Sequence, residues 1–485
     1  MKKKSLYIIA LASLSLFSCK GFLDVDPTNS IEASATIKTV EDAQVMINGL
    51  TSKLGAGSLY GRNILLYADA KGGDLTIVSQ GRGLDAFYVF NHNKDNNSYS
   101  GFWTDGFNAI LQANNIISNI EALQAAGSTL KFDNEKGQAL TLRAMMYFDL
   151  VRIYGKTYTD DPNALGVPIT TALLEDTAKP SREKVADVYK QILADLNAAT
   201  AILPKNINHG YINYYAAKAI LSRVYLTMGD YDKALEAADE VIASKAYSLY
   251  SNENWVASWS KEKGSESIFE IIKMKDQGDL GSSSLGFYYL RNKDENAIGN
   301  FTASDYFVNR LAQDPNDVRW GIFTKDELDR VAACYKYVGG TAAKKPGDGK
   351  TPYTAVNIKV IRLSEMYLTA AEAALKKKAA DPAKAAEYLN QIRKRSPDLA
   401  AATAATITEQ MILDEKSKEL YGEGHRFWDM IRLNKTITFN DEHVGVAMTH
   451  REKTITRKFY KTLLPIPQVE INANPGLEAQ QNPGY

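Results

Sequence analysis

Residues 214–244 constrain the fold most, because they have the pattern of two short helices joined by a tight turn. They read YYAAKAILSRVYLTMGDYDKALEAADEVIAS. Small residues recur in both halves, which lets two antiparallel helices approach closely, and Gly229-Asp230-Tyr231 supplies the turn. One such pair cannot bury its own apolar face, so several must stack. The chain is therefore predicted to be mainly α-helical.

The spacing within this pair is that of a tetratricopeptide unit. The residues at the expected spacings are Leu221, Tyr225, Gly229, Tyr231 and Ala234. A looser copy lies at residues 362–395, where Asp381-Pro382 suits the start of the second helix because proline is tolerated in a first helical turn. The pattern predicts a superhelix of tetratricopeptide-like helical pairs.

Further stretches have the apolar periodicity of helices. They are residues 39–53, 102–123, 134–154 and 181–203. In the last of these, Ser181 is predicted as the N-cap, and Pro204 stops the helix. The helical scaffold is predicted to span about 36–245 and 358–434.

The N-terminus has the form of a lipoprotein signal peptide. Lys2, Lys3 and Lys4 precede an apolar run from Leu6 to Phe17, and Leu16-Phe17-Ser18-Cys19 has the form of a lipobox. Residues 1–19 are therefore predicted to be the signal peptide, with Cys19 acylated, as by palmitate, and residues 20–35 a tether. The alternative is a plain secretory signal with a chance cysteine. Several acyl chains would anchor the protein stably in a membrane.

Charge and cysteine content exclude other classes. The chain has 57 basic and 57 acidic residues, so no positive excess argues for nucleic acid. Beyond Cys19 only Cys334 remains, so no intramolecular disulfide is expected in the mature protein. No later run approaches the roughly 18 apolar residues that a membrane span requires.

Two loop-rich regions interrupt the scaffold, at about 55–101 and 246–357. Both combine glycines with aromatic and polar residues, and such long loops usually carry function. Sugar recognition needs aromatic faces beside hydrogen-bonding side chains. The candidate ligand residues are Asp74, Arg82, Tyr88, Asn91, Asn93, Tyr99, Tyr288, Tyr289, Arg291 and Trp320. The alternative for each is packing within its loop. Trp103 and Trp428 are instead assigned to the core.

Residues 408–433 are predicted to form one long helix, ending in Glu423-Gly424-His425-Arg426-Phe427-Trp428-Asp429. Two interpretations compete: a catalytic or metal site, and a structural junction. His425 has no second histidine four residues on, so the helical zinc signature is absent and the junction is favoured. We predict no catalytic residue, metal ligand or cofactor. A calcium site among the aspartate-rich loops stays open, without a recognisable loop motif.

Several motifs occur in a characteristic order along the chain: the lipobox with FLD after it, WTDGFNAILQANNII, RAMMYFDLVRIYG, RLSEMYLTAAEA, EGHRFWDMIRL, and LPIP with a terminal NPGY. Together they resemble the SusD/RagB family of nutrient-binding outer-membrane lipoproteins of Bacteroidetes. The resemblance covers essentially the whole chain and implies a single SusD-like body over 36–485, with a C-terminal strap over 435–485.

The resemblance also implies a function. Family members sit outside the outer membrane on a SusC-like TonB-dependent transporter and capture oligosaccharides, or peptides in RagB-like members, for import; they are not enzymes. Three other functions compete with this one: a peptide receptor, a glycosidase, and a tetratricopeptide adaptor that binds only protein. A glycosidase needs two carboxylates about 5–10 Å apart.

Overall fold

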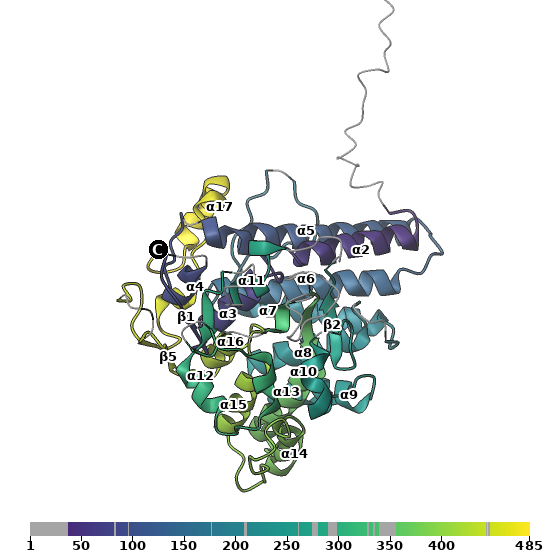
Figure 1. The fold of residues 1–485 in the computed structure, drawn as a ribbon. Coiled ribbons are helices and arrows are strands. Elements are labelled where there is room, and N and C mark those ends of the chain that lie inside the picture. The colour runs from purple at the N-terminus through teal and green to yellow at the C-terminus, as the bar shows by residue number, and fades with distance from the viewer. Residues whose placement is uncertain are drawn as a thin grey trace, which may run out of the picture.

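The computed structural model describes residues 37–81, 84–95, 97–175, 177–207, 211–259, 261–273, 280–289, 298–326, 329–332, 335–338, 356–442, 444 and 447–485. Helices dominate this part of the chain (Figure 1). The α-helices are α2 (Val40–Leu54), α3 (Asn63–Ala70), α4 (Asp85–Val89), α5 (Asn97–Ala125), α6 (Asp133–Tyr154), α7 (Val185–Ile202), α8 (Tyr214–Met228), α9 (Tyr231–Ala243), α10 (Asn252–Ser258), α11 (Gly286–Tyr289), α12 (Asp305–Leu311), α13 (Leu363–Lys376), α14 (Pro382–Arg393), α15 (Glu409–Glu419), α16 (Arg426–Arg432) and α17 (Gln468–Ala473).

Short strands and 3-10 turns connect these helices. The strands are β1 (Leu75–Ile77), β2 (Ser267–Ile271), β3 (Phe301–Ala303), β4 (Ile358–Arg362), β5 (Ile437–Thr438) and β6 (Thr454–Ile455). The 3-10 turns are η4 (Gly281–Ser283), η5 (Val318–Ile322), η6 (Tyr335–Tyr337), η7 (Tyr460–Thr462) and η8 (Pro475–Gln480). The prediction of a mainly helical fold is confirmed.

The helical pair at 214–244 forms as predicted. α8 ends at Gly229, whose φ of 78° is left-handed and therefore suits a residue without Cβ. The carboxylate of Asp230 then accepts a hydrogen bond from the backbone N–H of Lys233 and caps α9. The looser copy at 362–395 also forms two helices, and its second helix starts in the same way, because Asp381 caps α14 and Pro382 occupies the first turn. α13 lies against both α8 and α9, so the two pairs stack.

The predicted N-cap at Ser181 is wrong, because α7 begins only at Val185. The backbone just before the helix instead pairs with residues 166–167. The N–H of Gly166 donates to the carbonyl of Glu183 at 2.7 Å, and the N–H of Glu183 donates to the carbonyl of Val167 at 3.2 Å. This ladder holds residues before α7 in an extended conformation. The predicted end is confirmed, since α7 ends at Ile202, just before Pro204.

The prediction of one helix over 408–433 is also wrong. The stretch forms α15 and α16, separated by residues 420–425. Gly422 and Gly424 have φ angles of 79° and 81°, which a right-handed helix cannot accommodate. The two glycines therefore turn the chain between the helices.

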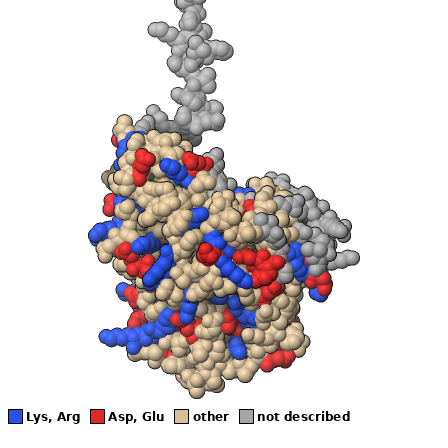
Figure 2. All heavy atoms as spheres, turned by 90° about the vertical axis from the view of Figure 1, so that its left-hand side faces the viewer, with Lys and Arg blue, Asp and Glu red and all other residues tan. Residues whose placement is uncertain are grey.

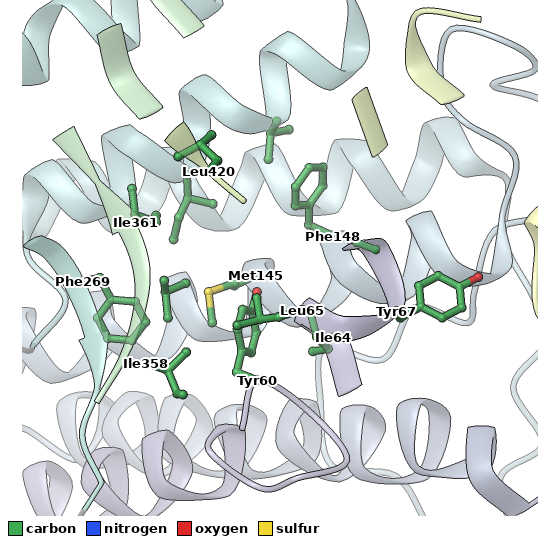
Figure 3. Packing of buried hydrophobic residues seen from close by; sticks show 14 of the residues in the cluster. Tyr60, Ile64, Leu65, Tyr67, Met145, Phe148, Phe269, Ile358, Ile361 and Leu420 are labelled. Carbon is green, nitrogen blue, oxygen red and sulfur yellow. The ribbon is translucent and has the colours of Figure 1, made fainter. Parts of the chain in front are cut away.

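A continuous apolar core joins the helical scaffold to the strands. Figure 3 shows Met145 of α6 among side chains that include Phe269 of β2 and Ile358 of β4. Trp103 and Phe427 are buried in this core, whereas Trp428 is only half-buried at its edge. The assignment of Trp103 to the core is confirmed, and that of Trp428 holds for only part of its ring.

The strands pair over long sequence separations. β2 pairs antiparallel with β4, β1 with β3, and β5 with β6. The β5–β6 pair forms a short hairpin within the strap. Beyond it, the last residues contact the end of α6 and the segment before α7, where Arg182 donates to the side-chain oxygen of Asn482 at 3.1 Å.

Candidate functional site

The two loop-rich regions meet at the β1–β3 pair. Leu75 lies opposite Ala303, and Ile77 lies opposite Phe301. The ladder continues on both sides, because the N–H of Val78 donates to the carbonyl of Asn300 at 2.8 Å and the N–H of Ser304 donates to that of Asp74 at 2.9 Å. Two regions that are more than 200 residues apart thus lie side by side.

The C-terminal strap supplies a third segment to the same face. The hydroxyl of Thr76 donates to the carbonyl of Asn440 at 2.6 Å, and the side chain of Asn440 accepts from the N–H of Asp305 at 2.9 Å. The guanidinium of Arg451 donates to the carbonyl of Tyr88 at 2.9 Å. In Figure 1 the labels β1, α4, β5 and α12 accordingly lie together on one side of the molecule.

A second contact between the loop regions lies at Arg62. Its guanidinium carbon is 5.5 Å from the centroid of the Tyr288 ring, and its side chain donates to the carbonyl of Ser282. Cation–π contacts of this kind favour arginine over an aromatic face. The segments around residues 62 and 282–288 therefore support one another.

Tyr88 was predicted to contact a ligand, but the structure buries its ring completely. Its hydroxyl donates to Asp441 at 2.8 Å, and burial raises the pKa of Tyr88. The guanidinium carbon of Arg451 lies 4.7 Å from the ring centroid and covers one face. A ring without exposed surface cannot stack on a ligand, so Tyr88 fastens α4 to the strap instead.

Three further predicted contacts are also buried. Asp74 forms an ion pair with Arg310 at 2.9 Å and accepts a hydrogen bond from Ser417 at 2.5 Å. The hydroxyl of Tyr289 donates to Asp69 at 3.3 Å. Tyr288 is buried beside Arg62. These groups are engaged within the protein, which corrects their prediction as ligand contacts.

The remaining candidates are scattered. Asn93 is exposed, with its side chain accepting from the N–H of Asp95 at 3.0 Å, and Asn91 is half-buried nearby. Trp320 is half-buried in η5, which contacts α10 rather than β1 or β3, so the structure does not bring it to the same face. Cys19, Arg82 and Arg291 lie outside the described residues, as does the side chain of Tyr99 at the start of α5.

The charged stretch around residue 423 is occupied by internal ion pairs. The guanidinium of Arg362 lies 2.9 Å from Glu266, 3.1 Å from Glu419 and 2.8 Å from Glu423. Lys336 lies 2.7 Å from Glu423. All of these groups are buried, and removing one partner from such a network leaves an uncompensated charge.

The imidazole of His425 fits the same interpretation. Burial lowers its pKa to about 4, so the ring is neutral near pH 7. The cavity between His425, Asp69 and Asp74 measures about 10 Å³, which is about the space of one water molecule. The arrangement agrees with a structural junction rather than a substrate site.

The described residues include no group of three or more histidine, cysteine, aspartate or glutamate side chains placed to hold a metal ion. Among the same residues, no helix has both the length and the apolar character to cross a bilayer.

Two of the surface hollows among the described residues have room for a small ligand. One, of about 470 Å³, lies between α5, the segment around residues 168–180 and α17, and Trp103, Phe107 and Leu111 are among its lining residues. The other, of about 480 Å³, lies between the end of α6, α16 and residues 457–463. Both volumes are typical of ligand pockets. Neither hollow was predicted from the sequence, because Trp103 and Trp428 lie within scaffold motifs and were assigned to the core.

On the face that Figure 2 shows, charge does not mark out a binding site. Figure 2 shows basic and acidic side chains interspersed, without one sign filling the visible surface. This agrees with the balanced composition of 57 basic and 57 acidic residues.

Known proteins share this architecture. The SusD family matches residues 323–485, and the family described as "Starch-binding associating with outer membrane" matches residues 21–226. The crystal structure of a SusD superfamily protein from Bacteroides thetaiotaomicron is 34% identical, with a TM-score of 0.83, covering 92% of this chain and 100% of that one. The chain belongs to the SusD/RagB family.

Other family members are similar over most of their length. "SusD-like protein P38" of Formosa agariphila is 25% identical over 527 residues, covering 97% of this chain and 99% of that protein. "Starch-binding protein SusD" of Bacteroides thetaiotaomicron is 25% identical over 450 residues, covering 78% of this chain and 76% of that protein. A SusD superfamily structure from Bacteroides vulgatus has 33% identity and a TM-score of 0.82, covering 93% of this chain and 100% of that one.

Proposed function

We propose that this SusD-family protein binds glycans at the outer membrane and delivers them to a SusC-like TonB-dependent transporter. The proposal rests on the observation that three segments meet on one face: the loop containing β1, the insertion containing β3, and the strap. A rigid scaffold with loops gathered at one face is a common way to build a binding site. The relative named for starch binding supports a saccharide as the ligand.

The proposal includes a lipid anchor at Cys19 and a body facing the cell exterior. The lipobox supports acylation, and residues 20–35 would then tether the body. Tethering raises the local concentration of the binding protein beside its transporter, so modest affinity suffices for capture. No catalytic step and no cofactor enters this proposal.

Calorimetry tests ligand binding directly. The chain lacking residues 1–19 is titrated with a panel of oligosaccharides and, separately, with mixed peptides. We expect saturable binding of at least one oligosaccharide. Binding of peptides alone would contradict glycan capture and support the alternative, a RagB-like peptide receptor.

Paired asparagine substitutions test where the glycan binds. Asn91→Ala with Asn93→Ala should weaken oligosaccharide binding, because each lost hydrogen bond to a sugar hydroxyl costs about 1 kcal/mol, or about fivefold in Kd. Asn48→Ala removes an exposed asparagine from α2 and serves as the matched control. Unchanged affinity in the paired variant would exclude the segment after α4 from the glycan site.

Transporter delivery needs its own measurement. We expect the lipid-anchored protein to co-purify from outer membranes with a TonB-dependent barrel. Cys19→Ala should release the body from the membrane while leaving glycan affinity in solution unchanged. Retention of the variant in the membrane would contradict the anchor.

A further inference from the structure

The hollow of about 480 Å³ beside α16 has a distinctive lining. Four cationic side chains surround it, and Asp160 is the carboxylate among its lining residues. The cations are Arg152, Lys156, Arg457 and Lys458. Such a concave cationic surface concentrates anions.

Arg457 has hydrogen-bond donors that the described part of the chain does not use. Its buried Nε lies 3.0 Å from the carboxylate of Asp160, which pairs the charge, whereas its two Nη groups donate to no described residue. Arg152 differs, because it donates to Asp149 and to the carbonyl of Phe148. A ligand oxygen that accepts from the Nη groups of Arg457 would therefore form a charge-assisted hydrogen bond.

Aromatic rings form the apolar part of the same hollow. Trp428 is half-buried, and the guanidinium carbon of Arg152 lies 4.9 Å from its ring centroid. Tyr460 is 44% exposed at the rim and is held edge-on by Tyr485, with ring centroids 5.5 Å apart. A fixed, partly exposed ring offers a flat apolar surface at small entropic cost.

We propose that this hollow is a saccharide site selective for sugars that carry a carboxylate, separate from the face at β1 and β3. Arg457 binds the carboxylate through its fork of N–H donors, which matches carboxylate geometry. Trp428 and Tyr460 contact the apolar face of the sugar ring. Lys156 and Lys458 attract the anion without fixing its orientation.

A matched pair of small sugars tests the proposal. The full chain, solubilised in detergent, is titrated with methyl glucuronide and with methyl glucoside, which differ at C6. Tryptophan fluorescence and calorimetry follow binding. We expect a Kd of about 1 mM or tighter for the glucuronide, and affinity about tenfold weaker for the glucoside, because a charge-assisted hydrogen bond contributes about 1.5 kcal/mol or more.

Variants identify the site. Arg457→Gln should weaken glucuronide binding about tenfold, whereas Lys384→Gln, which removes one positive charge from exposed α14, should leave it unchanged. Trp428→Phe should abolish the fluorescence response while calorimetry still detects binding. If Arg457→Gln does not fold, two other variants test the site. Arg457→Lys should bind the glucuronide with intermediate affinity, and Tyr460→Ala should bind it more weakly.

Four results would overturn the proposal. The first two are equal affinity for the two sugars and the absence of saturable glucuronide binding. The third is that the Arg457 and Tyr460 variants fold and bind the glucuronide as tightly as the natural chain. The fourth is equal binding of N-acetyltyrosine, which carries a carboxylate but no sugar. Oligosaccharide binding by the proposed function is measured separately, with the oligosaccharide panel and the asparagine variants, so a failure at this hollow would leave that result standing.

Discussion

Asp69 shows how one buried group affects the whole protein. Its carboxyl accepts a hydrogen bond from the backbone N–H of Gly424 at 2.9 Å. Burial, together with the nearby carboxylates of Asp74 and Glu423, raises the pKa of Asp69 from 3.8 to about 8. The group is therefore mainly protonated at neutral pH in the folded protein, and mainly ionised in the unfolded chain.

Asp69 should make the protein less stable as pH rises from about 4 to about 8. Over that window the folded state holds a proton that the unfolded state has lost, so the free energy of unfolding falls by up to about 1.4 kcal/mol per pH unit from this group. Asp69→Asn imitates the neutral form and lacks the titration. Urea unfolding at pH 5, 6.5 and 8 should show the stability of the variant rising relative to the natural chain.

Other carboxylates titrate in both proteins, so the difference between the two profiles is the measurement. Parallel profiles across the window would contradict a raised pKa at Asp69. The variant keeps a side-chain oxygen that can accept from Gly424.

For individual residues, the sequence could suggest which aromatic side chains contact a ligand, but it could not show which groups surround them in the fold. Tyr88 was predicted as a ligand contact from its loop composition. The groups that enclose it are Asn440, Asp441 and Arg451, more than 350 residues further along the chain. No local pattern could reveal such partners, and the same holds for Asp74 with Ser417.

Elements were more predictable than individual contacts, because their signals are local. α6 was predicted over 134–154 and forms over Asp133–Tyr154, since its apolar periodicity is uninterrupted. The break between α15 and α16 was missed. Heptad spacing of Leu413, Leu420 and Phe427 predicted one helix, and all three side chains are indeed buried, but the glycines at 422 and 424 redirect the chain between them.

Gly424→Ala should destabilise the protein by about 2–4 kcal/mol. A left-handed backbone costs a residue with Cβ roughly 1–2 kcal/mol, and crowding adds a comparable amount. The new Cβ would lie 2.9 Å from both Cα and Cδ2 of Leu65. Chemical denaturation of the purified variant measures the loss.

Gly49→Ala provides the matched control for this substitution. Gly49 lies within α2, and a Cβ there would meet no heavy atom within 4 Å. Alanine should stabilise that helix by about 0.5–1 kcal/mol. Equal effects of the two substitutions would contradict the strained turn at Gly424.

On the scale of the whole molecule, the C-terminus completes the scaffold. The side-chain amide of Asn482 donates to the carbonyls of Tyr154 and Leu464 at 2.8 and 2.7 Å. Arg182 donates to the carbonyls of Gly166 and Tyr154 at 2.6 and 2.8 Å, and it also donates to Asn482. The sequence predicted a strap over 435–485, but it did not show which buried carbonyls accept hydrogen bonds from the strap.

Asn482→Ala should lower the free energy of unfolding by about 2–3 kcal/mol, because buried carbonyls lose a donor and Arg182 loses an acceptor. Asn472→Ala, on the exposed side of α17, should change stability by less than about 0.5 kcal/mol. Thermal and urea unfolding compare the two variants. Equal losses would show that the Asn482 contacts contribute nothing specific.

The contacts between residues 182 and 482 also have a consequence for the order of folding. Because Asn482 is synthesised 328 residues after Tyr154, the carbonyl at the end of α6 lacks this donor until residue 482 has been made. Arg182 likewise lacks its acceptors on Gln480 and Asn482 until then. The end of α6 and the segment before α7 therefore complete their hydrogen bonds only after the strap has been synthesised.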